Sequence, residues 1–264
     1  MTGFLIDGLP PTEADLRYLA IVNYGAYTSF RVDAGRVRGL DLHLARLHAS
    51  AIELFGEAVG EDRLRDLMRL ALGDRRDAWL RVSLFSREIL PHSPSARGRP
   101  SVMIVVSPSP PPLAGRMRIQ ARTYVRDAAH LKHTATFPLI HARRLAIDAG
   151  FDDALFADAD GLISEGSLWN IGFLEGDCVV WPEAPMLEGV AEALISRGLA
   201  AVGLTERHAP VHLIDLDAFD AAFLCNSATP ACPITAIGDH VFGAAPGRID
   251  RLARAWSSNA PQPI

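Results

Sequence analysis

Short strand-like runs alternate with helical segments along the whole chain, and this alternation constrains the fold more than any other feature. The strand-like runs are rich in β-branched and aliphatic residues and show no helical stripe. Helices are predicted where apolar residues recur at helical spacing, as from Leu40 to Leu54, with Asp41 as the N-cap. The pattern predicts a mixed α/β (α+β) protein. The expected strands are 18–22, 78–85, 101–106, 117–124, 153–158, 162–164, 169–174, 178–181, 221–224 and 233–237, and the expected helices are 40–54, 62–72, 138–149, 190–202 and 248–257.

The chain has 264 residues, which is enough for one large domain or two of ordinary size. Hydrophobic residues make up 49% of it and charged residues 22%, a globular composition that needs no disulfide or metal to hold a core. Turn formers and prolines gather before residue 115. We therefore expect a smaller N-terminal α/β domain over 1–120 and a larger C-terminal domain over 121–264.

Charge and cysteine usage exclude several classes of function. The net charge is −5 without a basic tract, so we expect no nucleic-acid partner. The apolar runs are too short for a membrane span, and Met1–Pro10 lacks the pattern of a secretory signal, so a cytoplasmic location is expected. Cys178, Cys225 and Cys232 are too few and too far apart for a disulfide framework or a metal site, and are predicted to be buried, inert thiols.

Several short motifs follow one another in the second half of the chain. They are 131–134 (LKHT), 153–156 (DALF), 163–173 (ISEGSLWNIGF), 186–190 (MLEGV), 226–227 (NS) and 232–234 (CPI). Together with 43–47 (HLARL), their order and spacing resemble the class IV, or fold-type IV, pyridoxal-phosphate family. This family includes branched-chain and D-amino-acid aminotransferases and aminodeoxychorismate lyase. The resemblance covers about residues 20–240, and the Ser-Glu-Gly…Asn stretch is its most specific part.

The resemblance implies pyridoxal 5'-phosphate as cofactor and Lys132 as the catalytic residue that binds it covalently. Such chemistry requires a primary amine that bonds to the cofactor aldehyde and then moves a proton. Lys132 is the only lysine in the chain, since the other 25 basic residues are arginines, whose high pKa bars them from this reaction. A surface lysine is the alternative.

The resemblance also implies the remaining cofactor-binding residues. Glu165 would hold the pyridine nitrogen protonated, although alone it could be a solvated charge. The phosphate would be bound by backbone amides, a hydroxyl and a cation. The implied phosphate-binding residues are Arg46, Gly189, Val190, Ala191, Asn226 and Ser227. Asn170 is expected to tie the turn after Glu165 together.

Two positions depart from the family pattern, and two bear on the substrate. Ala191 stands where relatives often have a threonine, so one hydroxyl contact to phosphate is lost. Phe137 replaces a tyrosine of the branched-chain enzymes and can stack but cannot hydrogen-bond, which weakens that assignment. Tyr27 is expected to face the substrate, with core packing as the alternative. Thr28 matches a position that varies between the family's activities.

The function that follows is transfer of an amino group between an amino acid and a 2-oxo acid. The alternative is a lyase of the aminodeoxychorismate lyase type, which releases pyruvate, and a non-catalytic homologue is a third. The resemblance implies a homodimer in which residues 91–100 form a loop that reaches the substrate pocket of the neighbouring subunit. It also implies that the cofactor binds in the cleft between the two domains. Arg46 would come from the first domain, and Lys132, Glu165 and Ser227 from the second. Candidates for the substrate carboxylate are Arg81, Arg87, Arg97, Arg99, Arg122 and Arg126.

Overall fold

The computed structural model describes residues 3–93, 95, 97–113 and 115–264, and its contacts divide the chain into two units. The first unit contains the chain up to Pro110 together with Leu131–Ala135 and Pro261–Ile264. The second contains Pro111–His130 and Thr136–Ala260. This division falls ten residues before the expected boundary at 120/121, and the two short returns to the first unit were not expected. Pro94 and Ala96 of the expected subunit-exchange loop lie outside the described residues.

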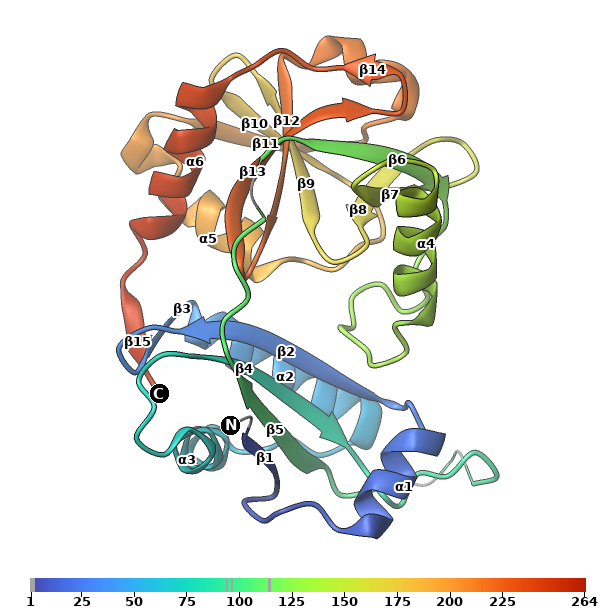
Figure 1. Cartoon of the computed structure of the whole chain (residues 1–264), viewed down its shortest axis with the longest axis vertical. Coiled ribbons are helices and arrows are strands. Elements are labelled where there is room, and N and C mark those ends of the chain that lie inside the picture. Colours follow the sequence, from blue (N-terminus) through green and yellow to red (C-terminus); the bar gives the residue numbers. More distant parts are fainter. Residues whose placement is uncertain (1–2, 94, 96, 114) are drawn as a thin grey trace. The chain divides into compact units, whose positions relative to one another are not determined.

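The first unit is an antiparallel four-stranded sheet in the order β1-β5-β4-β2, with helices α2 and α3 packed on one face (Figure 1). Alternate residues of the strands face these helices, as the two-residue period of a strand requires. Phe30, Leu80 and Ile104 meet Leu47 and Met68 in this core. The elements are β1 (Gly3–Ile6), α1 (Glu13–Ile21), β2 (Gly25–Val32), β3 (Arg36–Arg38), α2 (Leu40–Phe55), α3 (Glu61–Leu72), β4 (Ala78–Phe85), β5 (Ser101–Ser107) and β15 (Pro261–Pro263).

The strand expected at 18–22 is wrong, because these residues belong almost entirely to helix α1. A capping box starts this helix. The Thr12 hydroxyl accepts a hydrogen bond from the Asp15 amide, and the Asp15 carboxylate accepts one from the Thr12 amide. Two helix-terminal donors are satisfied in this way, and this local stabilisation outweighs the β-like composition of the apolar run.

The N-cap expected at Asp41 is also wrong. Gly39 occupies the N-cap of α2 with a positive φ of 71°, a conformation that favours glycine. Asp41 lies in the first turn, where its negative charge is favourable, and its amide donates to the side chain of Gln262.

The second unit is built around a barrel. Six strands pair in the order β9-β12-β13-β6-β7-β8, and β8 pairs again with β9, which closes the ring. The hairpins expected within 153–164 and 169–181 are confirmed as β7–β8 and β9–β10. The strands are β6 (Met117–Thr123), β7 (Asp153–Ala157), β8 (Ile163–Gly166), β9 (Asn170–Glu175), β10 (Cys178–Pro182), β11 (Thr205–Ala209), β12 (Ala221–Asn226), β13 (Thr229–Ile237) and β14 (His240–Val241).

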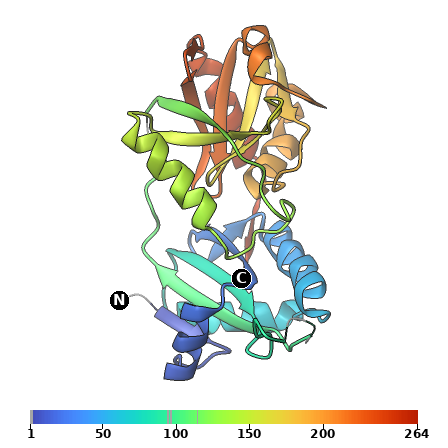
Figure 2. The ribbon, with the colours of Figure 1, turned by 90° about the vertical axis from the view of Figure 1, so that its right-hand side faces the viewer.

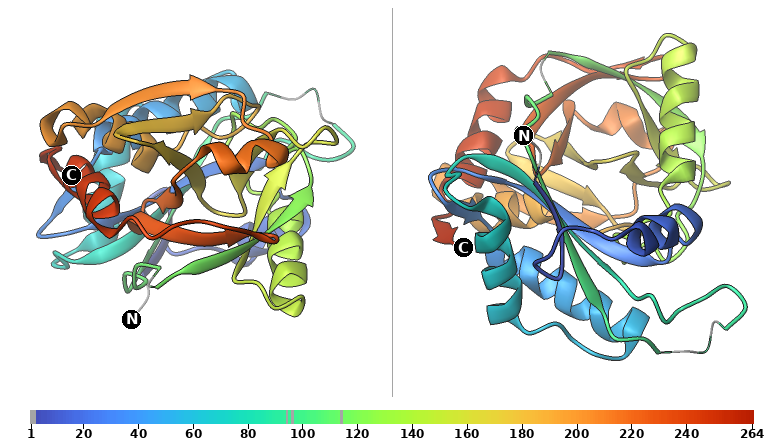
Figure 3. Two further views of the ribbon diagram at one scale, coloured as in Figure 1. Left: turned by 90° about the horizontal axis from the view of Figure 1, so that it is seen from above. Right: turned by 60° about the horizontal axis from the view of Figure 1, so that its bottom comes forward.

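Helices cover this barrel from two sides. Helix α4 (Phe137–Asp148) packs on β7, and α5 (Val190–Gly198) and α6 (Pro246–Ser257) pack together over β12 and β13 (Figures 2 and 3). Two 3₁₀ segments, Ala200–Val202 and Leu213–Ala218, complete the unit. Apolar side chains fill both the barrel interior and the layer beneath α5 and α6.

The cysteines agree in part with the expectation. Cys225 and Cys232 are buried, and burial raises the pKa of both thiols, so both are unreactive as thiolates. Cys178 is partly exposed. Within the described ranges, no helix is long and apolar enough to cross a membrane.

Candidate active site

Lys132 belongs to a segment that extends the sheet of the first unit. The Tyr27 amide donates to the Lys132 carbonyl at 2.8 Å, and the Thr134 amide donates to the Gly25 carbonyl at 2.9 Å. Ala26 faces His133 in the bridge between these bonds. Strand β2 lies at the edge of its sheet, so its free backbone groups can accept this pairing. The expectation placed Lys132 in the second domain, but its segment packs with the first unit.

Two cations lie near the ring of Tyr27. The Lys132 Nζ is 5.2 Å from the ring centroid, and the Arg81 guanidinium carbon is 3.7 Å from it. Both distances suit cation–π attraction, which favours a positive group near an aromatic face. Tyr27 is only 7% exposed, so the ring is held in a fixed place. The first unit therefore presents an amine, a guanidinium and a phenol together.

A second group lies on the other face of β2, toward α2. The Thr28 hydroxyl and His43 Nδ1 are 2.6 Å apart, and both side chains are buried. Burial, and then the positive charges of Arg46 and Lys132, lower the pKa of His43 well below its usual value, so its imidazole is neutral. Because Thr28 bonds to His43 and alternates with Tyr27 along the strand, it does not share the face of Tyr27.

Glu165 lies in the second unit, on β8, beside a buried arginine. Its carboxylate oxygen is 3.6 Å from Arg126 Nη1, and the two side chains are 6% and 5% exposed. The Leu187 amide also approaches this carboxylate, at 3.4 Å. Burial beside a cationic partner fixes the orientation of this carboxylate. Arg126, one of the candidates for the substrate carboxylate, is therefore engaged by Glu165.

Asn170 connects β9 to the segment that leads into α5. Its side-chain amide donates to the Leu187 carbonyl at 2.7 Å. A Cβ atom at Gly189 would lie 2.0 Å from Asn170 Oδ1, so only glycine fits there. The Asn170 side chain thus holds residues 187–189 in place, while its backbone pairs with that of Glu165 across the turn between β8 and β9. Gly189 is the N-cap of α5 and makes no side-chain cap, which leaves the first-turn amides of Val190 and Ala191 without a capping side chain.

Sequence reasoning missed Glu192, which follows this turn. The side chain is buried, and its carboxyl has a pKa raised to about 7. Burial is the main cause of the rise, a hydrogen bond from the Gly189 amide opposes it, and the neighbouring carboxylates, Glu188 first, add to it. Within the described part of the chain, its Oε2 has no hydrogen-bond partner. An acidic residue three positions after a helix N-cap is the signal that could have found it.

The turn after β12 contains the other expected phosphate residues. Asn226 Oδ1 accepts hydrogen bonds from the Ala228 and Thr229 amides, at 2.9 and 2.8 Å. This side chain therefore shapes the turn, and Ser227 at the turn is partly exposed. Phe137 begins α4 and is 74% exposed, with its ring stacked on His141 at 5.3 Å between centroids.

The family of the chain is decided by its match to known proteins. The model of the amino-transferase class IV family matches residues 25–237. The chain belongs to the class IV aminotransferase family. This match spans the Lys132 segment, Glu165 and the turn after β12, so it includes every expected site residue.

The relatives of this class IV chain include both a lyase and aminotransferases. The chain is 25% identical over 236 residues to the aminodeoxychorismate lyase of Bacillus subtilis (strain 168), covering 84% of this chain and 80% of that protein. Among solved structures, the branched-chain aminotransferase of Thermoproteus uzoniensis with norvaline has a TM-score of 0.81 at 20% identity, over 96% of this chain and 93% of that one. The PLP-bound form of a hypothetical aminotransferase from Mycobacterium tuberculosis has a TM-score of 0.79 at 19% identity, over 98% and 100%. At these identities the solved structures establish the fold.

Proposed function

We propose that the chain is a pyridoxal-phosphate-dependent aminotransferase in which Lys132 binds the cofactor covalently. The observation that carries the proposal is the placement of the only lysine. The segment that carries Lys132 is held at a sheet edge by two backbone hydrogen bonds, one of them to the Lys132 carbonyl. The Lys132 amine lies near Tyr27, and its charge contributes to the lowered pKa of His43. An ordinary surface lysine would show no such fixed surroundings.

The residues present fit the cofactor at its pyridine nitrogen and at its phosphate. Glu165, paired with Arg126, is suited to hold a protonated pyridine nitrogen. The α5 N-terminus offers amides without a capping side chain, and an anion is favoured there. The residues that would bind phosphate are Arg46, Gly189, Val190, Ala191, Asn226 and Ser227. Since these groups come from both units, binding one cofactor with all of them is part of the proposal.

When bound, pyridoxal phosphate supplies an electron sink for the bonds of the substrate α-carbon. Lys132 would provide the amine that accepts and returns the α-proton. The Tyr27 ring lies 5.2 Å from that amine, at a distance that suits cation–π attraction. Arg126 keeps the Glu165 carboxylate from rotating away.

Arg81 is the residue we propose for the substrate carboxylate. It lies over the same Tyr27 ring as the Lys132 amine, so an amino acid at that amine would have a guanidinium near its carboxylate. Arg87 is instead paired with Asp15, and Arg126 with Glu165. Tyr27 would lie against the substrate.

The test is chemical labelling of the purified protein. The protein is expected to be yellow, and borohydride reduction should fix the cofactor on the peptide that contains Lys132. Lys132→Ala should lose the visible absorbance and the activity while remaining folded, and Arg144→Ala, an exposed cation of α4, is the control. Labelling at the N-terminal amine, or full turnover by Lys132→Ala, would refute the assignment.

A lyase is the second candidate function. It is supported by the match to the Bacillus subtilis aminodeoxychorismate lyase, which covers 84% of this chain. A lyase would release pyruvate from aminodeoxychorismate without an acceptor. An aminotransferase would form a new amino acid only when a 2-oxo acid is present. One incubation of each kind separates the two activities.

A homodimer is also part of the proposal. Within the first unit, α2 and α3 pack on one face of the sheet only, and the opposite face carries the partly buried side chains of Trp79, Met103 and Val105. Light scattering should give twice 28.6 kDa, and an active monomer would contradict it. The proposed cytoplasmic location is consistent with the free thiols of Cys178, Cys225 and Cys232.

A further inference from the structure

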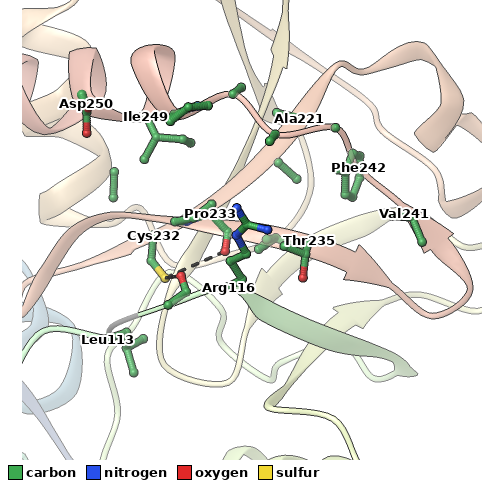
Figure 4. Close-up of a pocket in the computed structure, with 18 residues that line it drawn as sticks. Leu113, Arg116, Ala221, Cys232, Pro233, Thr235, Val241, Phe242, Ile249 and Asp250 are labelled. Carbon is green, nitrogen blue, oxygen red and sulfur yellow. Dashed lines mark hydrogen bonds between the residues drawn. The ribbon is translucent and has the colours of Figure 1, made fainter.

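A cavity of about 590 Å³ lies in the second unit between α6, β13 and the segment that leads into β6 (Figure 4). Every residue that lines it belongs to that unit, and none of them is a proposed cofactor or substrate residue. Pockets for small molecules occupy roughly 300–1,000 Å³. The cavity is therefore large enough for a ligand of its own.

Small side chains create this space. Ala221, Ala231, Gly243, Ala244 and Ala245 line the cavity where α6 approaches the sheet. Longer side chains at any of these positions would fill it. The cavity opens to solvent, because Arg116 and Val241 in its lining are exposed.

The walls are mainly apolar, and two of their polar side chains, Cys232 and Thr235, make hydrogen bonds to backbone carbonyls. Ile234, Phe242 and Ile249 contribute buried hydrophobic surface. The Cys232 thiol donates to the Gly115 carbonyl at 3.5 Å, and the Thr235 hydroxyl donates to the Met117 carbonyl at 3.2 Å. A ligand here would meet an apolar surface with few free hydrogen-bonding groups.

Arg116 provides the one cationic group of this lining. Figure 4 shows its guanidinium among the lining side chains, beside Pro233, whereas Asp250 lies on α6 at the margin. Across the described residues, no hydrogen bond or ion pair engages the Arg116 guanidinium. Arginine binds carboxylates through two parallel hydrogen bonds, which adds both strength and geometric selectivity.

We propose that this cavity binds a small carboxylic acid with an apolar body, its carboxylate paired with Arg116 and its body against Phe242 and Ile249. Charge complementarity selects the acid over a neutral or cationic analogue. The proposal does not depend on the reaction, because it uses none of the residues assigned to the cofactor or the substrate.

The test compares ligands that differ only in charge. Calorimetric titration of the purified protein with 4-phenylbutyrate should show saturable binding, with affinity about tenfold or more above that for 4-phenylbutan-1-ol, as expected for one charged hydrogen-bonded contact. Arg116→Gln should abolish this preference. Arg144→Gln, which removes an exposed cation of α4 outside the cavity, should leave it unchanged.

A second experiment locates the ligand. A diazirine derivative of 4-phenylbutyrate should cross-link within 231–246, and Ala231→Phe, which fills the cavity, should prevent this. Equal affinity for the acid and the alcohol, a preference that survives in Arg116→Gln, or cross-links confined to the Lys132 or Glu165 peptides would each overturn the proposal. Since Arg116→Gln changes only an exposed side chain, the proposal stays testable even if Ala231→Phe does not fold.

Discussion

The buried histidine of the first unit should make stability depend on pH in a defined window. The pKa of His43 in the folded chain is lowered well below its usual value, first by burial and then by the charges of Arg46 and Lys132. The unfolded chain therefore binds a proton near pH 6.5 that the folded chain does not bind. Above pH 6.5 both states carry a neutral imidazole, and His43 has no effect. Below it, stability falls as the pH falls.

The size of this effect follows from the linkage between proton binding and folding. One proton bound only by the unfolded state changes the free energy of unfolding by about 1.4 kcal/mol per pH unit. Between pH 6.5 and pH 5.0, His43 should therefore remove about 2 kcal/mol of stability. The 2.6 Å contact with Thr28 favours the folded form with a neutral ring, but it does not alter this slope.

The measurement is urea unfolding of the wild type and His43→Phe at pH 7.5, 6.5, 5.5 and 5.0. The phenylalanine keeps a ring next to Phe30, whose centroid is 4.7 Å from that of His43. It leaves the Thr28 hydroxyl unpaired, so at pH 7.5 the variant should be less stable than the wild type by about 1–3 kcal/mol. This difference should shrink by about 2 kcal/mol as the pH falls to 5.0, because only the wild type loses the His43 contribution. The other histidines titrate in both proteins and cancel in the comparison. Parallel stability curves down to pH 5.0 would show that His43 protonates in the folded chain and would refute the reasoning.

Substitutions at three further positions test other parts of the structure. Glu165→Gln should retain the cofactor but slow turnover by about 10²–10⁴-fold in steady-state assays, because an amide cannot hold a protonated pyridine nitrogen, and an unimpaired variant would move that role elsewhere. Gly189→Ala should raise the dissociation constant of the cofactor, measured by absorbance titration, because its Cβ would lie 2.0 Å from Asn170 Oδ1; unchanged affinity would contradict this. Ile264→Ala should lower the free energy of unfolding, measured in urea, by about 2–5 kcal/mol, since that side chain lies in the core of the first unit. Ile264→Val should lower it by only about 0.5–1.5 kcal/mol. Equal losses in the two variants would argue against a packed side chain.

The sequence by itself determined the class of chemistry and most of the local structure. The order and spacing of several motifs, from the only lysine through the Ser-Glu-Gly…Asn stretch to residues 232–234, indicated the family by resemblance, and the family match over residues 25–237 confirms it. The β7–β8 hairpin was predictable as well, since turn residues and alternating apolar positions act over a few residues. Helix α1 shows the limit of this reasoning, because the apolar composition of 18–22 is typical of a strand, whereas the capping box at Thr12 and Asp15 starts a helix that includes most of these residues.

Only the tertiary structure decided which distant groups meet. Lys132 pairs with Tyr27, 105 positions earlier, because β2 is an edge strand whose free backbone groups accept a further segment. The same holds for Arg126: its spacing from Glu165 did not reveal that the two side chains would be buried together. Six arginines were equivalent candidates in the sequence, and Arg81 stood out only once its guanidinium lay over the same ring as the lysine amine. Such pairings depend on strand order and burial, which arise when the whole chain packs, and no local pattern of residues encodes them.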